Sequence, residues 1–474
     1  MLRYGLLFIP YVLAALLRGA PSASYLVAWG GSFWIFYLTL SGAVRPLPGG
    51  ESLAHQLFRP IGVTHLVFAG YTAVTSIFHF LDLHGYYYFS HDAFAEVSRS
   101  QLLLTAEAQR YYVLAHAAVA TGILVFATYR QSGEWRLRPD LDRPRFMLYL
   151  AGTMLVATQA LKFVPGLGQV QGRLAVLALV ASVLSLALSI VQGRKGLILI
   201  NTGLYGLNLI QAFLSGWKEE VIVVFLLLGI FLYPFYKRAV TVLAPAVLIA
   251  LLVLLPTYNG IFRQLNWSGQ VSAQQAAEVA LDRTLDGEVA LAGQTWTFLT
   301  NRFSEIGLFT RYLEHVPEHR PHYGLEITEN AVMGLVPGLV WPGKPRLEQL
   351  GMERAYENGV VERGSEVSAK PQFVVDAYLS FGALGVLVAC FVFGALASLA
   401  SRLAERWFGG YLLGSGLVYT AFFRIFWKGS TFEYVANAIF WSFILMGALF
   451  LAGRLLGVLV PAPENVRSKE RVRQ

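Results

Sequence analysis

The sequence predicts an all-α protein that crosses a membrane many times, and three observations support this fold class. Of its 474 residues, 55% are hydrophobic and only 14% are charged, whereas a soluble domain carries about 25% charged residues. Apolar runs of about the length that crosses a bilayer recur along the chain. A single long hydrophilic segment, residues 258–372, separates them into two groups. Together these features predict a polytopic membrane protein with one large loop.

Twelve apolar runs are the predicted transmembrane helices. They cover residues 4–18, 23–40, 60–80, 111–129, 146–163, 174–192, 196–214, 220–236, 239–257, 373–400, 410–426 and 434–458. Nine spans therefore fall within residues 1–257 and three within 373–460, and residues 461–474 form a basic tail. The composition of the 258–372 loop predicts a mostly helical subdomain, including a helix over residues 295–316.

Positive charge in the short loops predicts the orientation. The basic residues concentrate in four loops and the tail: Arg130, Arg136, Arg138, Arg143 and Arg145; Arg194 and Lys195; Lys237 and Arg238; Arg402 and Arg406; and residues 464–474. With twelve spans all of these lie on one side, which the positive-inside rule assigns to the cytoplasm. Both termini are then cytoplasmic, and the 258–372 and 81–110 loops lie outside the cytoplasm.

The charge balance and the cysteine content argue against several other functions. The net charge of +8 is explained by the cytoplasmic loops, and no basic domain offers a nucleic-acid surface. Cys390 is the only cysteine, so an intramolecular disulfide is excluded. The histidines of residues 315–322 have spacings of four and three, but Pro317 and Pro321 interrupt any helix there. We therefore predict no metal site and no cofactor.

Polar residues within or beside the spans need an explanation, because ionisable groups in a membrane are costly. On the outer side these groups are Lys218, Glu219 and Glu220 in one place, Asp376 in a second, and Arg424, Lys428 and Glu433 in a third. Long cationic side chains can reach the interface and serve only as anchors. Asp376 is too short for this, so we expect it to have a cationic partner. Asn201 and Asn208 share a helix face, which favours hydrogen bonds between helices.

The outer loop contains two further candidate features. Arg302 and Glu305 are three residues apart on one apolar face of the predicted helix, whereas Arg311 lies on the opposite face. Arg302 and Glu305 either form a buried pair that braces the loop, or Arg302 binds an anion such as phosphate.

The second feature is an apolar segment, residues 331–341, of about 16 Å if helical, or half the hydrocarbon thickness. Pro337 breaks it, and Trp341, Lys344 and Arg346 follow at or beyond its end. We expect this segment to dip into the outer leaflet or lie on it, with both cations at the depth of lipid diphosphates.

Residues 296–386 carry a recognisable order of motifs. Asn301-Arg302 is followed by "PHYG" (321–324), by "VPGLVWPGKP" (336–345) and by "VVDAYLSFGALG" (374–385), and "SGWKEE" (215–220) stands earlier in the chain. This order resembles the Wzy-type polymerases of bacterial O-antigen and exopolysaccharide repeat units, in the oligosaccharide repeat unit polymerase family. The sequence departs from the family at Gly338, where many members have arginine, and it lacks the Arg-x10-Gly motif of some O-antigen polymerases. No roles are carried over from that motif.

The resemblance implies a GT-C-like membrane glycosyltransferase at the outer face of the bacterial cytoplasmic (inner) membrane. Such enzymes move a glycan from a polyprenyl-diphosphate carrier to another lipid-linked repeat unit, and they need no nucleotide or metal. Expected partners are polyprenyl-diphosphate-linked oligosaccharide, membrane lipid and a chain-length regulator protein. The chemistry requires cations for the diphosphate and a base for the acceptor hydroxyl.

The candidate site residues follow from these requirements. The candidate diphosphate ligands are Arg302, Arg311, Lys344, Arg346, Lys218 and Arg424. The candidate bases are Glu305, His322, Glu326 and Asp376, and the sequence does not choose among them. Trp341 and Trp427 are candidate sugar platforms, with interfacial anchoring as the ordinary alternative.

Three other functions stay open at this stage. An O-antigen-ligase-like transferase would use the same donor with a different acceptor. A lipid-linked oligosaccharide flippase or another transporter also accommodates twelve spans, but transporters usually place polar groups near the midplane between internal repeats. Here the polar groups gather at one face, and no internal repeat is evident. A non-catalytic membrane assembly protein is the remaining alternative.

Overall fold

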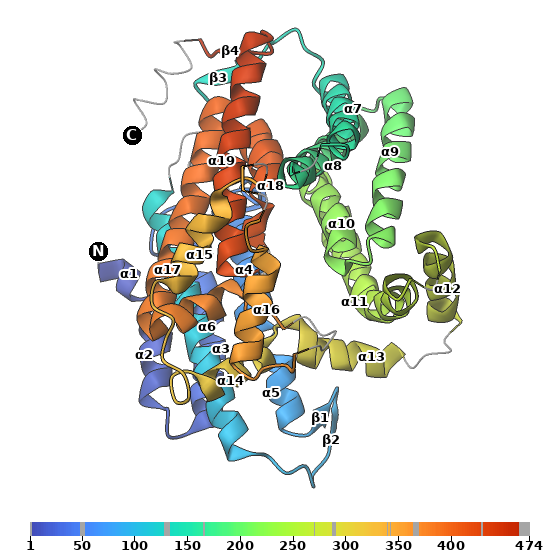
Figure 1. Ribbon diagram of the computed structural model, residues 1–474. Helices are drawn as coiled ribbons and strands as arrows, with labels where there is room; N and C mark the ends of the chain where they lie inside the picture. Colours follow the sequence, from blue (N-terminus) through green and yellow to red (C-terminus); the bar gives the residue numbers. More distant parts are fainter. Residues whose placement is uncertain are drawn as a thin grey trace. The chain divides into compact units, whose positions relative to one another are not determined.

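The computed structural model describes residues 2–47, 53–127, 133–164, 166–269, 271–286, 291–338, 340–341, 343–363, 369–427 and 430–463. This part of the chain is mostly helical (Figure 1). Its strands form two short antiparallel pairs, β1 (Tyr86–Tyr87) with β2 (Ser90–His91) and β3 (Trp135–Leu137) with β4 (Leu459–Pro461). The prediction of a helical protein is confirmed. The predicted tail lies mostly outside the described residues, which end at position 463.

Among the described residues, seven helical segments are long and apolar enough to cross a membrane. They are α3 (Pro21–Leu40), Pro60–Leu83, α8 (Gly168–Val191), α9 (Lys195–Leu214), α11 (Lys237–Trp267), α17 (Phe373–Trp407) and α19 (Phe432–Leu455). Each coincides with one of the twelve predicted spans. The Pro60–Leu83 segment is built from η3 (Pro60–Thr64), α4 (His65–Ala69), η4 (Gly70–Val74) and α5 (Ile77–Leu83).

In the part of the chain that the structure describes, the other five predicted spans do not form helices that are both long and apolar enough. The segments concerned are α1 (Leu2–Gly5) with α2 (Ile9–Leu16), α6 (Arg99–Phe126), α7 (Arg143–Leu161), α10 (Lys218–Leu232), and η6 (Leu412–Tyr419) with α18 (Thr420–Phe422) and η7 (Arg424–Trp427). α2 has only 8 residues and α10 only 15. The count of twelve spans is therefore not confirmed.

The predicted loop is largely helical, as expected. Its elements are α12 (Ala273–Leu285), α13 (Leu291–Phe298), η5 (Leu299–Phe303), α14 (Ile306–His315), α15 (Glu326–Leu335) and α16 (Leu347–Glu357). The prediction of one helix over residues 295–316 is wrong, because the helix stops at Phe303 and Glu305 adopts a left-handed backbone (φ 55°, ψ 20°). Arg302 and Glu305 therefore do not share a helix face.

The chain forms two compact units. Unit 1 comprises Met1–Arg138, Leu161–Arg173 and Phe303–Gln474, and unit 2 comprises Pro139–Ala160 and Leu174–Arg302. In unit 1, α6 packs along α17 and α3, and α15 packs on α19. In unit 2, α9, α10 and α11 pack together, with α12 and α13 against α11. The predicted interhelical hydrogen bonds are confirmed here, since Asn201 and Asn208 donate to Ser189 and Ser182 of α8, at 3.4 and 3.2 Å.

A pair of glycines allows α6 and α17 to approach closely. A Cβ atom at Gly122 would lie 2.1 Å from the Phe391 carbonyl oxygen, and one at Gly394 would lie 2.2 Å from that of Val119. Small residues at such crossings let membrane helices pack backbone to backbone. At the same crossing, the Ser398 hydroxyl of α17 donates a hydrogen bond of 2.9 Å to the Ile123 carbonyl of α6.

Replacing Gly394 with alanine is expected to destabilise the protein by about 1–3 kcal/mol, because the new methyl group forces these two backbones apart. Thermal unfolding of the detergent-purified protein measures the effect. Gly447→Ala on α19 is the matched control, since a Cβ atom there meets nothing within 4 Å. Equal melting temperatures for the two variants would contradict the close packing of α6 and α17.

Three arginine-bearing segments meet at one end of unit 1. β3 lies within the first basic loop and pairs with β4 after α19, with Arg136 opposite Val460. At the end of α19, the Arg454 guanidinium carbon lies 4.4 Å from the Trp135 ring centroid. The Arg406 Nε atom, at the end of α17, lies 2.9 Å from the Glu134 Oε2 atom. Asp376 precedes a break in α17 at Gly382, and the 24 positions from Gly382 to Arg406 rise about 36 Å along the helix. The polar residues near the start of α17 therefore occupy the opposite end of unit 1.

Candidate functional site

A break in α17 is where two of the sequence motifs meet. Gly382 has a positive φ of 58° (ψ −140°), a conformation that glycine adopts at little cost and other residues rarely adopt. The break frees the carbonyls of Leu379 and Ser380, which accept hydrogen bonds from the backbone N–H groups of Tyr323 and Gly324, at 2.9 and 3.0 Å. The "PHYG" turn and the "VVDAYLSFGALG" segment thus form one structural element.

His322 packs beside this break. Its ring lies edge-on to Tyr378, with 5.4 Å between ring centroids, and the Tyr378 hydroxyl donates to the Val316 carbonyl at 2.8 Å. His322 is half-buried, and its Nδ1 atom has no hydrogen-bond partner among the described residues. This candidate base is therefore held by packing, with one ring nitrogen uncommitted to the described part of the chain.

Asp376 belongs to a fully buried ionic cluster with Arg354 of α16 and Glu433 of α19, here called the Arg354 cluster. The Arg354 Nε and Nη2 atoms lie 2.9 and 3.1 Å from the Asp376 carboxylate, and Nη2 also donates to Glu433 Oε2 at 2.8 Å. The expectation of a cationic partner for Asp376 is confirmed. The partner, however, is Arg354, which sequence reasoning did not single out.

The excess negative charge of the Arg354 cluster is met by the backbone. Asp376 accepts the Phe432 N–H at 2.7 Å, and both carboxylates lie in the first turns of their helices, where the helix dipole contributes about half a positive charge each. Burial alone would lower the pKa of Arg354, but Asp376 and Glu433 outweigh burial and raise it. With Asp376 enclosed in this way, the geometry supports a structural role for it and not the role of general base.

Glu305 occupies a more suitable position for a base. Its carboxylate is half-buried and accepts a hydrogen bond of 2.7 Å from the Gln372 Nε2 atom. Its left-handed backbone costs about 1–2 kcal/mol in a residue other than glycine, and strain of this kind is typical of functional positions. Gln372 is only 6% exposed, and its Oε1 atom has no hydrogen-bond partner in the described part of the chain.

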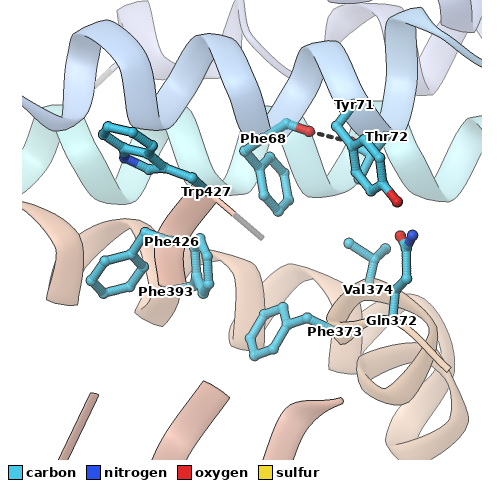
Figure 2. Close-up of a pocket in the computed structure, with 9 residues that line it drawn as sticks. All are labelled: Phe68, Tyr71, Thr72, Gln372, Phe373, Val374, Phe393, Phe426 and Trp427. Atoms are coloured by element: carbon cyan, nitrogen blue, oxygen red, sulfur yellow. Dashed lines mark hydrogen bonds between the residues drawn. The ribbon is translucent and has the colours of Figure 1, made fainter. Parts of the chain in front are cut away.

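Gln372 also lines a small apolar pocket in unit 1 (Figure 2). The lining residues are Phe68, Tyr71, Thr72, Gln372, Phe373, Val374, Phe393, Phe426 and Trp427. Figure 2 shows the Gln372 amide at one end beside Tyr71 and Thr72, and the rings of Phe426 and Trp427 at the other end. The Trp427 indole N–H donates to the Thr64 hydroxyl at 3.2 Å, and the side chain is buried. This tryptophan therefore lines the pocket and is not an exposed interfacial anchor.

The half-length apolar segment folds back on itself. Helix α15 ends at Leu335, and the Lys344 ammonium group donates to the carbonyls of Gly334, at 2.9 Å, and Val336. Burial lowers the pKa of Lys344. Gly334 also accepts from the Asn437 side chain of α19, at 2.7 Å. Lys344 therefore closes the end of α15, a role that the sequence did not predict.

The remaining candidates are distributed over both units. In unit 1, Arg311 donates to the Val360 carbonyl at 3.0 Å, Arg424 is buried in η7, and Arg346, Trp341 and Glu326 are exposed. In unit 2, Arg302 is exposed in η5, and the Lys218 ammonium lies 3.4 Å from the Phe298 ring centroid. Lys428 lies outside the described residues. In the part of the chain that the structure describes, no three His, Cys, Asp or Glu side chains are grouped to hold a metal ion.

The comparisons with known proteins give the family of the chain. Residues 9–461 match the family model described as "Domain of unknown function (DUF8712)", and the chain belongs to this family. No curated protein and no solved structure matches the sequence significantly.

Proposed function

We propose that this protein is a membrane glycosyltransferase that polymerises polyprenyl-diphosphate-linked repeat units into O-antigen or exopolysaccharide. The observation that carries the proposal is the arrangement of the segments that resemble Wzy-type polymerases. The "PHYG" turn is bonded to the broken start of α17, and α15, which leads into "VPGLVWPGKP", packs on α17 and α19. Segments separated by tens of residues thus come together at one end of unit 1. The proposal includes twelve spans and a GT-C-like arrangement.

The distribution of charge supports an outward-facing site. The arginine-bearing segments of unit 1 meet at the end of α17 opposite Asp376, and the positive-inside rule assigns such segments to the cytoplasm. The Glu305 and Gln372 side chains would then face the exterior of the bacterial cytoplasmic membrane. Nucleotide sugars are absent there, so a donor must carry its own leaving group, as a polyprenyl-diphosphate-linked glycan does.

In the proposed reaction Glu305 is the general base. It accepts the proton of an acceptor hydroxyl while the hydroxyl oxygen bonds to the anomeric carbon of the donor and the bond to the diphosphate breaks. Gln372 orients the carboxylate through its 2.7 Å hydrogen bond. In unit 1, Arg346 and Arg424 are the cations proposed to stabilise the leaving diphosphate. The Arg354 cluster fixes the start of α17. Gln372 is the residue that immediately precedes this helix, so its position is fixed as well.

The proposal is tested in cells from which the gene for this protein has been deleted. We expect such cells to lose long-chain polymer and to accumulate single lipid-linked repeat units at the outer face of the membrane. A missing flippase would leave those units at the inner face, and a missing ligase would leave complete polymer on its lipid carrier. Normal polymer in the deleted cells would contradict the proposal.

A further inference from the structure

Arg263, near the end of α11, rests on two tryptophans in unit 2. Its guanidinium carbon lies 4.7 Å from the ring centroid of Trp217 and 4.7 Å from that of Trp267. The two rings are themselves neighbours, with centroids 5.8 Å apart. The Arg263 Nε atom donates to the Gly216 carbonyl at 2.9 Å. Stacking and this hydrogen bond together fix the position and orientation of the guanidinium group.

The other two nitrogens of Arg263 are available to a ligand. Neither Nη atom makes a hydrogen bond to a residue that the structure describes, and the side chain is only half-buried. A guanidinium group with both Nη atoms available forms a planar fork that matches two oxygens of a phosphate group. Because the stacked group is already ordered, binding costs it little further conformational entropy.

Charged residues of both signs lie near Arg263 in unit 2. Arg302 and Glu219 are close enough to Arg263 to act on it electrostatically, with opposite signs. Lys218 stands next to Trp217 in the chain, with its ammonium group 3.4 Å from the Phe298 ring centroid.

The position of Arg263 along the helices points to a membrane lipid as the source of the anion. Trp217 and Trp267 are 50% and 56% exposed, as tryptophans in the interfacial belt of a membrane commonly are. Helix α9 begins at Lys195, beside Arg194, and ends at Leu214, three residues before Trp217; its 20 residues rise about 30 Å, or one hydrocarbon thickness. Arg263 therefore lies at headgroup level, at the end of unit 2 opposite its basic end.

We propose that Arg263, braced by Trp217 and Trp267, binds the phosphate of a lipid headgroup. If the proposed function holds, on which this further step rests, that lipid is a polyprenyl-diphosphate-linked oligosaccharide, bound in unit 2 at a position additional to the one proposed at Arg346 and Arg424 of unit 1. An ordinary phospholipid offers the same chemistry and is the other source of a phosphate group.

The test measures binding of three probes to the purified full-length chain in detergent: a short-chain polyprenyl diphosphate, phosphatidylglycerol and inorganic pyrophosphate. We expect Arg263→Gln to weaken binding of the polyprenyl diphosphate at least tenfold. Arg263→Lys keeps the charge but loses the planar fork, so we expect a several-fold weakening with the fold retained. Arg283→Gln is the matched control, since it removes one exposed positive charge from α12 of the same unit.

The probes distinguish the two lipid sources. A loss confined to polyprenyl diphosphate assigns the site to the substrate, and an equal loss for phosphatidylglycerol assigns it to membrane lipids in general. Unchanged affinity in both Arg263 variants overturns the proposal, as does an equal loss in Arg283→Gln. If Arg263→Gln fails to fold, Arg263→Lys decides alone. A wild-type protein that binds through Arg263 but does not lengthen oligosaccharide would refute the proposed function while leaving this site intact.

Discussion

Replacing Arg354 with leucine is expected to destabilise the protein by about 3–5 kcal/mol, the usual cost of breaking a buried ion pair. The change leaves Asp376 and Glu433 fully buried, close together and without their cation. They must then take up protons or pull apart, and either event loosens α16 from the ends of α17 and α19. We expect poor insertion or a melting temperature many degrees lower in detergent.

Two further variants separate charge from size. Arg363→Leu is the matched control, because Arg363 is exposed and its pair with Glu353 lies at the surface, where such pairs contribute little. The combined replacement of Arg354, Asp376 and Glu433 by apolar residues of similar volume should recover much of the stability. A melting temperature of Arg354→Leu equal to that of wild type would show that the Arg354 cluster does not hold these helices together.

Replacing Glu305 with glutamine is expected to lower the rate of oligosaccharide lengthening by about 10²–10⁴-fold, the usual contribution of a general base. Glutamine keeps the size of the side chain and an oxygen that can accept the hydrogen bond from Gln372. The melting temperature should therefore stay close to that of wild type. The initial rate with saturating lipid-linked substrate, measured beside thermal unfolding, gives both quantities.

Glu326→Gln is the comparison for this experiment. Glu326 is also a candidate base in the same unit, but it is exposed at the start of α15. We expect its replacement to change the rate less than twofold. A normal rate in Glu305→Gln, or a large loss in Glu326→Gln instead, would contradict the assignment of the base.

The helical fold could be predicted because it depends on composition and local periodicity. Apolar runs predicted the seven helices that, among the described residues, are long and apolar enough to cross a membrane. The shared face of Asn201 and Asn208 predicted their hydrogen bonds to α8, since a polar amide in an apolar helix needs a partner. Twelve spans could not be established by the same signal, because hydropathy does not report where a helix such as α10 ends.

The details of the candidate site depend on contacts between distant segments. The burial of Asp376 required a cation, but the sequence could not single out Arg354, because only the folding of α16 onto α17 and α19 brings it there. The break before α14 was missed because Glu305 is left-handed without being glycine or asparagine. The ammonium group of Lys344 is bonded to the end of α15, a contact that the sequence did not predict, and its depth at lipid headgroups stays a prediction. Arg263 belongs to no recognised sequence motif. Only the folded chain brings it onto the rings of Trp217 and Trp267.

The central claim, that this protein polymerises lipid-linked repeat units, is tested most directly by reconstitution. The purified protein is placed in liposomes with a polyprenyl-diphosphate-linked oligosaccharide as the single substrate, without nucleotide, added metal or another protein. Mass spectrometry of the extracted lipids then measures the number of repeat units on each carrier. We expect a ladder of two, three and more repeat units with release of polyprenyl diphosphate, and no ladder with Glu305→Gln. A folded wild-type protein that leaves every carrier with a single repeat unit would contradict the account.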